Sequence, residues 1–423
     1  MVHVHGPRAQ VQADPIRQVS GLGELIAVPV DVGKSSAMAL VADFAGQQLV
    51  APFTFSLDRH GLIELVLRVE SALEGRPVKL VRVGVEAAGH YQRPLTRSGA
   101  LPSCWQVVEC NPAHVTAQRR VNGQRGVKSD QIDLTAIFDL IVAGRGYLTG
   151  EADLALLELT AWVAHRHRRV TVRTGLKNQL LGQLDRCFPG VQDTVASSLL
   201  DTLAGRLIVS DFADPDRLAR LGVARFRRYA AARDVRVTGV LAERLVAAAR
   251  AAIRTPEATV ARQVLAEDLE LLALLDRQID DVEQVLERLL PDTPFVVLTT
   301  TPGWGVVRAA CYGAAVGDPA RWPTAKHLYR ASGLTPTLYA SAGKRHDGGI
   351  SREGSVPLRR AILELSKGLR MCEPASRRHA HQMRERGKPG GVIACALANR
   401  ANRIALSMVR HQTPYDPDRW SHD

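Results

Sequence analysis

The sequence contains no Cys-x-x-Cys pair, no low-complexity tract and no internal repeat. Its isolated cysteines argue against a zinc site and are typical of reduced thiols in a cytoplasmic protein. The first residues lack the apolar core of a secretion signal, and no apolar run approaches the length needed to cross a bilayer. We therefore expect a cytoplasmic protein without membrane association. The six cysteines are Cys104, Cys110, Cys187, Cys311, Cys372 and Cys395.

The charge of the chain is strongly positive. Its 423 residues suit two or three domains, and they carry a net charge of +12 with a pI near 9.8. Residues 341–410 hold 15 Lys and Arg against 5 Asp and Glu, a net charge of +10. Charge gathered in one segment is expected of a protein that binds phosphate backbones. The alternative is a basic protein with no nucleic-acid role, because charge indicates partners and not fold.

Short apolar runs broken by glycine and polar residues begin near Leu25 and predict an α/β domain. Three strands come first, then a helix, and then strands alternate with helices, which indicates a mixed sheet. Pro29 falls inside the first strand, so either the strand pairs around it or the strand lies a residue or two away. The expected strands are 25–33, 35–43, 47–56, 78–86 and 105–110, and the expected helices are 58–73 and 130–144.

The middle of the chain is predicted to be helical. The segment 165–173 carries five Arg or His residues before its Val-Thr-Val run, typical either of a contact to a DNA or RNA backbone or of a solvated helix end. After Pro256 a heptad-like pattern predicts a long helix that packs within the chain or forms a dimeric coiled coil. Its apolar positions are Leu265, Leu272, Leu275, Ile279, Val282, Leu286 and Leu289.

Four acidic residues stand where a sheet could gather them. Asp31 and Glu86 end apolar strands, and Asp130 and Asp133 share a helix face at spacing i, i+3. Clustered carboxylates repel one another unless divalent cations neutralise them. Two Mg²⁺ or Mn²⁺ ions there would suit cleavage of a phosphodiester. The alternative is four ordinary surface acids.

These residues carry a resemblance to a known family. The order of strand Asp, strand Glu and then Lys-Ser-Asp-x-x-Asp (residues 128–133), with VVECNPAHV before it, resembles the DEDD transposases of the insertion-sequence-110 family, also grouped with insertion sequences 116 and 902. The resemblance implies an N-terminal RNase H-like domain similar to the RuvC resolvase. It also implies DNA as donor and target, a structured guide RNA, and a homo-oligomer of two or four chains.

The resemblance continues through the C-terminal part, from TPGWG to the Leu-Arg-Arg of 358–360. In this family a loop serine is the nucleophile, and the matching residue is Ser341. The sequence departs from the family pattern at Ala342, and Ser351 and Ser355 are nearby rivals. A serine hydroxyl needs activation by a base or a metal. The cations expected to hold phosphates are Lys344, Arg345, Arg352, Arg359 and Arg360.

The expected organisation has five parts. They are a flexible tail at 1–22, a RuvC-like catalytic domain at 23–165, a helical linker with coiled coil at 166–292, a mainly α-helical transposase domain at 293–412 and a tail at 413–423. The predicted function is DNA strand transfer by metal-assisted phosphoryl transfer to and from a serine. Two alternatives stay open: a RuvC-like endonuclease that hydrolyses DNA with water, and a nucleic-acid-binding protein without catalysis.

Overall fold

The structure, a computed structural model, describes residues 21–87, 89–124, 126, 129–149, 153–195, 199–341 and 344–420. For 338–341, 344–347 and 419–420 it describes the backbone alone. The tail predicted at 1–22 therefore lies outside the described residues, apart from its last two positions. The chain divides into two compact units. One holds residues up to Leu154 with Val316–Arg359 and Asn402–His411, and the other holds Ala155–Ala315, Arg360–Ala401 and the chain from Gln412.

A six-stranded mixed sheet forms the N-terminal domain, in the order β3-β2-β1-β4-β5-β6. β1, β4 and β5 are parallel, and β2, β3 and β6 run antiparallel to their neighbours. All five predicted strands are present, and only the two-residue β6 was missed. The strands are β1 (Leu25–Val32), β2 (Ser36–Asp43), β3 (Gln48–Ser56), β4 (Leu80–Glu86), β5 (Gln106–Cys110) and β6 (Tyr147–Leu148).

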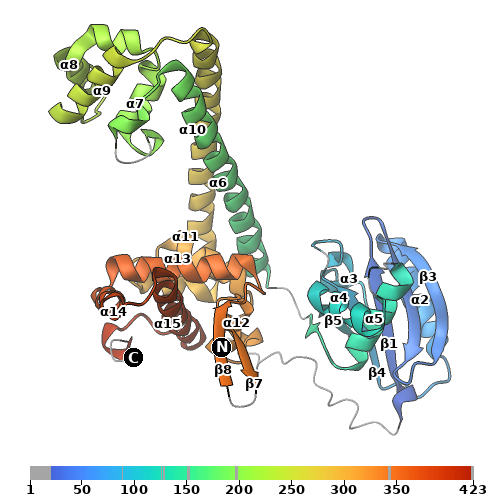
Figure 1. The fold of residues 1–423 in the computed structure, drawn as a ribbon. Helices are drawn as coiled ribbons and strands as arrows, with labels where there is room; N and C mark the ends of the chain where they lie inside the picture. Colours follow the sequence, from blue (N-terminus) through green and yellow to red (C-terminus); the bar gives the residue numbers. More distant parts are fainter. Residues whose placement is uncertain are drawn as a thin grey trace. The chain divides into compact units, whose positions relative to one another are not determined.

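Helices cover both faces of this sheet (Figure 1). Alternation along β1 sends Ile26, Val28 and Val30 into one core with α2 (Arg59–Leu73). Leu25 and Ala27 enter the opposite core, which is closed by α5 (Asp130–Val142) and α4 (Pro112–Val121). A short helix, α3 (Arg93–Arg97), lies between β4 and β5 in sequence. The site therefore depends on which side chains face α5.

Pro29 lies within β1, and the strand pairs around it. β4 pairs with β1 continuously from Leu25 to Val30, with Pro29 opposite Gly84. The register against β2 instead omits Val28 and Pro29. Because proline has no amide proton to donate, the interruption falls on the β2 side. The strand placement expected from the sequence is correct.

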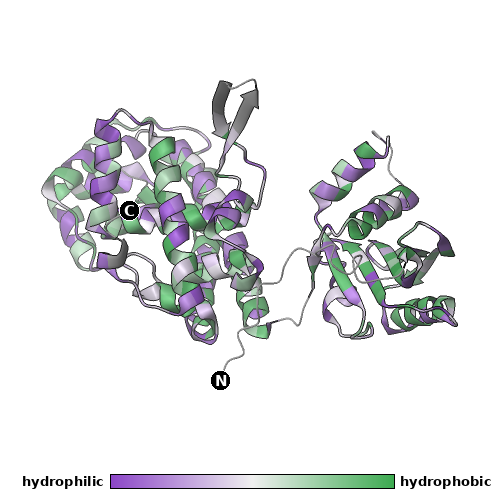
Figure 2. Ribbon diagram, turned by 90° about the horizontal axis from the view of Figure 1, so that it is seen from below, coloured by the Kyte–Doolittle hydropathy of each residue, from purple (hydrophilic) through white to green (hydrophobic). Residues whose placement is uncertain are grey.

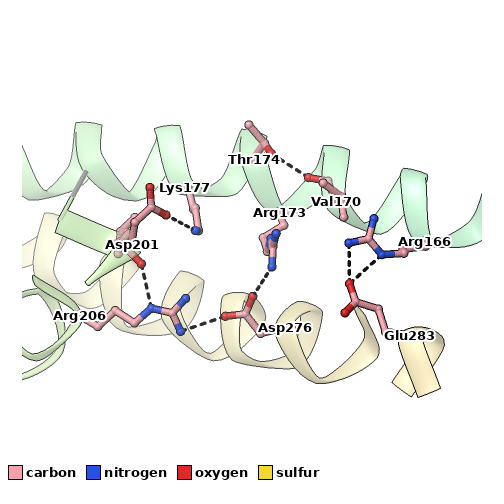
Figure 3. Close-up of polar contacts among 10 residues, drawn as sticks. Arg166, Val170, Arg173, Thr174, Lys177, Asp201, Arg206, Asp276 and Glu283 are labelled. Carbon is pink, nitrogen blue, oxygen red and sulfur yellow. Dashed lines mark hydrogen bonds and ion pairs between the residues drawn. The ribbon is translucent and has the colours of Figure 1, made fainter. Parts of the chain in front are cut away.

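Two long helices pair side by side in the second unit: α6 (Leu154–Cys187) and α10 (Ala258–Leu289). Arg166 donates to Glu283 at 2.8 Å and Arg173 to Asp276 at 3.0 Å, as Figure 3 shows. The partner's number falls as the α6 number rises, so the helices are antiparallel. The basic segment 165–173 thus lies inside α6 and not at a helix end, and two of its arginines are already paired.

The heptad-like face of α10 is buried within the chain. Six of its seven predicted apolar positions are buried, and Leu289 is half-buried. Leu265, Leu272 and Leu275 share one core with Leu176 and Leu180 of α6. Of the two alternatives that the sequence left open, the structure supports packing within one chain. The boundary predicted between 165 and 166 falls inside α6.

Three shorter helices close one end of this pair, away from α11 and α13 (Figure 1). They are α7 (Leu203–Asp211), α8 (Pro215–Ala231) and α9 (Gly239–Ala251). We call the pair of α6 and α10 the helical arm, and α7–α9 its tip. Helices in this unit alternate hydrophobic and hydrophilic residues, as Figure 2 shows, which is the pattern expected of helices half-buried in a core.

The C-terminal part is mainly helical, as predicted, but it contains a β-hairpin that was not predicted. β7 (Pro336–Ser341) pairs antiparallel with β8 (Lys344–Ile350). The described part of the predicted tail holds α16, and the amide of Tyr415 donates to Thr300 at 2.9 Å. The helices are α11 (Val306–Val316), α12 (Ala325–Ala331), α13 (Val356–Cys372), α14 (Pro374–Glu385), α15 (Gly390–His411) and α16 (Pro417–Trp420).

The Pro-Gly-x-Gly turn at 302–305 has a packing role. Gly303 has φ 80°, and a Cβ there would lie 2.4 Å from the carbonyl oxygen of Gly368 on α13. Next to it, the indole of Trp304 donates to the Leu365 carbonyl at 2.7 Å. Only glycine tolerates both this backbone conformation and this approach. The motif therefore fixes the chain against α13.

One helix of the described chain, α15, is long and apolar enough to cross a membrane by length and composition alone. The sequence analysis expected no such run, and this expectation was wrong. A share of 56% of the apolar window is buried inside the protein. Ile393, Leu397, Ile404 and Leu406 are among the buried residues. This burial is typical of a core helix.

Candidate metal centre and C-terminal serine

Sheet register brings Asp31 and Glu86 together. β1 and β4 are parallel neighbours with Val30 opposite Val85, so the next residue of each strand lies at the same edge. Both side chains alternate away from the α2 core and point to the face that α5 covers. Each is half-buried. Adjacent carboxylates at the carboxyl ends of parallel strands follow directly from this topology.

Helix α5 contributes the third carboxylate. Ser129 caps its N-terminus by accepting a hydrogen bond from the amide of Ile132 at 3.4 Å. Asp133 stands in the first turn, where the helix dipole favours a negative charge. Its side chain is only 1% exposed. One oxygen from each of Asp31, Glu86 and Asp133 lies within 4.8 Å of the others.

Two residues of β4 that the sequence analysis did not single out hold α5 in place. Gly84 allows close approach, since a Cβ there would lie 2.4 Å from Cγ2 of Ile141. Arg82, 1% exposed, donates to the Ile141 carbonyl at 2.9 Å and to Gln106 at 3.1 Å. Burial lowers the pKa of Arg82 to about 10, so it stays charged at neutral pH. A glycine between buried valines was the available sequence signal.

The side chain of an arginine lies against the carboxylate cluster. Arg119, in the last turn of α4, donates to Asp133 at 2.6 Å and to Thr116 at 3.0 Å. This pair is largely shielded from solvent, with side-chain exposures of 16% for Arg119 and 1% for Asp133. Its position offsets part of the repulsion among the three acids. No pattern in the sequence distinguished Arg119 from its neighbours.

The structure does not bring Asp130 into this group. Asp130 is exposed at the first position of α5, one turn before Asp133, and its oxygens are not among those within 4.8 Å. Both residues share a helix face as their spacing requires. The described site thus contains three of the four predicted carboxylates, with the fourth beside it at the solvent boundary.

The donor set suits a hard divalent cation. Carboxylate oxygens are the ligands that Mg²⁺ and Mn²⁺ prefer, and three of them converge here. Cys110 lies opposite Glu86 in the β4–β5 register, and burial, with the charges of Glu86 and Glu109, raises its thiol pKa to about 12. A neutral thiol is a poor ligand. The residues that would hold the ion are Asp31, Glu86 and Asp133.

Ser341 is the last residue of β7 and pairs with Lys344 of β8. Its side chain lies outside the described residues, as do those of Lys344 and Arg345. The rival serines have structural contacts. Ser355 accepts from the amide of Leu358 at 3.3 Å and so caps α13, and the Ser351 hydroxyl lies 3.5 Å from the Gly333 carbonyl.

The other predicted phosphate contacts follow the hairpin. Arg352 is exposed and has φ 57°, an uncommon value for a residue with a side chain. Its carbonyl accepts from Arg359 at 3.1 Å. Arg360 is exposed on α13, and its guanidinium lies 2.8 Å from Nδ1 of His167 on α6. The positive charges of Arg360 and Arg166, together with burial as the largest effect, lower the pKa of His167.

Comparisons with known proteins match two regions of this chain to transposase families. Residues 28–189 match a model of DEDD transposases of the IS110 type, and residues 296–381 match the transposase family IS116/IS110/IS902. The first match contains all four predicted carboxylates, and the second contains Ser341.

Similar proteins include two matched over short regions. The IS110 43.6 kDa protein of Streptomyces coelicolor is 35% identical over 120 residues, 28% of this chain and 30% of its own length. The IS1328 transposase of Yersinia enterocolitica is 30% identical over 145 residues, 33% and 43% of the two chains. The chain thus spans less than half the length of these two relatives.

A third relative aligns almost throughout. The IS116 44.8 kDa protein of Streptomyces clavuligerus is 24% identical over 403 residues, 92% of this chain and 96% of its own. This chain belongs to the IS116/IS110/IS902 family of transposases.

Proposed function

We propose that this protein is a DNA transposase that breaks and rejoins strands through a covalent link to Ser341. The convergence of Asp31, Glu86 and Asp133 within 4.8 Å carries the proposal, because that arrangement suits metal-assisted phosphoryl transfer. Two ions of Mg²⁺ or Mn²⁺ would polarise the scissile phosphate and lower the pKa of the attacking hydroxyl. Asp130 would complete the ligand set by a side-chain rotation at the start of α5.

Each step of the reaction exchanges one bond for another. Ser341 Oγ would bond to phosphorus while the bond from phosphorus to a deoxyribose oxygen breaks, and that oxygen takes up a proton. A hydroxyl of the partner strand would then attack the phosphoserine, and the serine would regain its proton. The phosphodiester energy is kept between the two steps, whereas hydrolysis with water would lose it. This supports strand transfer over simple cleavage.

The caps and hydrogen bonds of the rival serines support the choice of Ser341. A hydroxyl that caps α13 would leave the helix end unsatisfied if Ser355 moved to attack a phosphate. Lys344, Arg345, Arg352, Arg359 and Arg360 are proposed to hold the DNA phosphates around the hairpin. From the family we further propose a structured guide RNA and a dimer or tetramer, acting in the cytoplasm.

The experiment uses a suicide DNA substrate with the full chain, followed by protease digestion and mass spectrometry. We expect a nucleotide adduct on the peptide that contains Ser341, lost in Ser341→Ala and in Asp31→Asn. Asp31→Asn should still bind DNA, since it changes one side chain at the metal site. An adduct on Ser351 or Ser355 would move the role. Cleavage without any adduct in Ser341→Ala would instead support the water-dependent endonuclease.

A further inference from the structure

A second basic surface lies far along the chain from the C-terminal one. Residues 217–236, in α8 and the turn after it, carry seven arginines and a single acid, Asp234. Their net charge of +6 is half of the +12 of the whole chain. All seven are exposed: Arg217, Arg220, Arg225, Arg227, Arg228, Arg233 and Arg236.

Three of these arginines have local structural contacts. Arg217 donates to the Asp211 carbonyl at 2.8 Å, and Arg225 donates to the Leu221 carbonyl at 2.9 Å. Arg233 lies 3.7 Å from the ring centroid of Tyr229, and its Nε is 3.5 Å from the carboxylate of Asp211. Packing of the tip accounts for these three.

Packing of the tip does not account for the other four arginines. Within the part of the chain that the structure describes, no carboxylate lies at ion-pair distance from Arg220, Arg227, Arg228 or Arg236. A solvated helix face usually mixes both signs of charge, because like charges on neighbouring turns repel. Gly222 interrupts α8 with φ 68° and ψ 172°, so a new helical segment starts next to Arg220 and adds the positive end of its dipole.

We propose that Arg220, Arg227, Arg228 and Arg236 bind the phosphate backbone of duplex DNA. This makes the tip of the helical arm a second DNA-binding surface, separate from the carboxylate site and the hairpin. The proposal rests on the proposed function, because a strand-transfer enzyme must hold duplex beyond the bonds it breaks. The binding is independent of sequence, since arginine contacts to phosphates carry no base information.

The chemistry of the surface favours a duplex over unpaired nucleic acid. Proteins that bind single strands or RNA loops stack bases on exposed aromatic rings. The aromatic side chains among these arginines are Phe226, which is fully buried, and Tyr229, which is half-buried beneath Arg217 and Arg233. Phosphate contacts need only cations and helix N-termini, both of which are present here.

The test measures how DNA affinity depends on salt. The full chain is titrated against a fluorescent duplex of random sequence without divalent cation, at several salt concentrations. Each phosphate contact contributes about 0.9 to the slope of log K against log salt. For R220Q/R227Q/R228Q/R236Q we expect the slope to fall by about 2–4 and the affinity to fall at least about tenfold. The four Arg→Lys substitutions should preserve the slope, since they preserve the charge.

A charge-matched control separates a local surface from net charge. R59Q/R76Q/R93Q/R97Q removes four exposed arginines from the N-terminal domain, and its slope should change by less than that of the tip variant. Equal losses in both variants, or an unchanged slope in the tip variant, would overturn the proposal. A loss of affinity for an RNA hairpin but not for the DNA duplex would overturn the choice of ligand.

Folding and chemistry are checked separately. Glutamine is a good helix former, and unchanged helical circular dichroism would show that the tip is intact. If the fourfold variant does not fold, the pairs R220Q/R236Q and R227Q/R228Q are measured instead, each with about half the effect. Because binding is measured without divalent cation, Asp31→Asn should bind like the wild type. Failure of the catalytic proposal would therefore leave this result unaffected.

Discussion

Replacing Gly84 by alanine tests whether α5 is positioned by its close approach to β4. The added methyl would lie 2.4 Å from Cγ2 and 3.1 Å from Cδ1 of Ile141, and 3.0 Å from Cγ2 of Ile137. Carbon atoms prefer about 3.5–4.0 Å, so the closest pair must separate by about 1 Å or more. Both isoleucines are fully buried and cannot turn into solvent. The helix must therefore shift or its side chains must leave their rotamers.

The sign of the change in unfolding free energy for Gly84→Ala distinguishes open space at position 84 from close packing. Where space is open, Gly→Ala stabilises by about 0.4–1 kcal/mol through the unfolded chain. Overpacking a dense core costs about 1–3 kcal/mol. Since Gly84 has no positive φ, nothing in its backbone conformation adds to this cost. We expect a net loss of about 1–2 kcal/mol for Gly84→Ala, from these two terms together.

The assay is native-state hydrogen exchange, read on peptides that cover α5. Gly175→Ala on α6 is the control, because a Cβ at Gly175 meets nothing within 4 Å. It should stabilise its own helix by about 0.5–1 kcal/mol. Because Asp133 lies on the same helix, Gly84→Ala should also reduce the gain in stability that Mg²⁺ gives.

A double mutant isolates the contact. Ile141→Ala removes two of the three atoms that crowd position 84, among them the closest, and alone should cost about 2–5 kcal/mol. The pair Gly84→Ala with Ile141→Ala should cost less than the sum of the two, by about 1 kcal/mol or more. Additive costs, or a neutral or stabilising Gly84→Ala, would refute the close-packing argument.

Three further predictions concern the same domain. Arg119→Gln removes the guanidinium 2.6 Å from Asp133, so the metal-free variant should melt at a lower temperature than the wild type. Its melting temperature should rise more on addition of Mg²⁺ than that of the wild type does, and equal rises would contradict this. Arg82→Met removes the buried guanidinium that donates to the Ile141 carbonyl, which keeps only the bond from the Gly144 amide at 3.2 Å, and should cost about 1.5–3 kcal/mol in urea unfolding, whereas an unchanged midpoint would rule out the anchoring role. Alkylation of the native protein at pH 8 should label exposed Cys104 and spare Cys110, which is buried and has a raised pKa. Mass spectrometry of the peptides measures both, and labelling of Cys110 before Cys104 would contradict the prediction.

The strands of the catalytic domain could be predicted because their signals are local. Alternation of apolar residues and the glycines between runs located five of the six strands of the sheet. The hairpin β7–β8 was missed, since β8 is polar and holds two adjacent glycines, and so lacks the alternation of apolar residues that marks a strand. The apolar run of α15 was also missed, because three arginines interrupt it.

The sequence by itself located the residues on which the proposed chemistry rests: a strand-end Asp31 and Glu86, an Asp-x-x-Asp helix start, and an ordered set of C-terminal motifs. Spacing along a strand or a helix fixes which residues share a face, so such patterns are readable from the chain alone. Only the tertiary structure decided that Asp133 joins Asp31 and Glu86 while Asp130 faces solvent.

Side-chain contacts between residues far apart in the sequence were likewise decided by the fold. The heptad-like face of α10 packs against α6, and Arg166 and Arg173 of α6 meet acids more than 100 residues away. Among the described residues, no carboxylate lies at ion-pair distance from Arg220, Arg227, Arg228 or Arg236 at the tip. The amino-acid composition gives only the number of charges on a chain. The path by which the chain returns on itself decides which of them are neutralised, and therefore which remain to bind a polyanion.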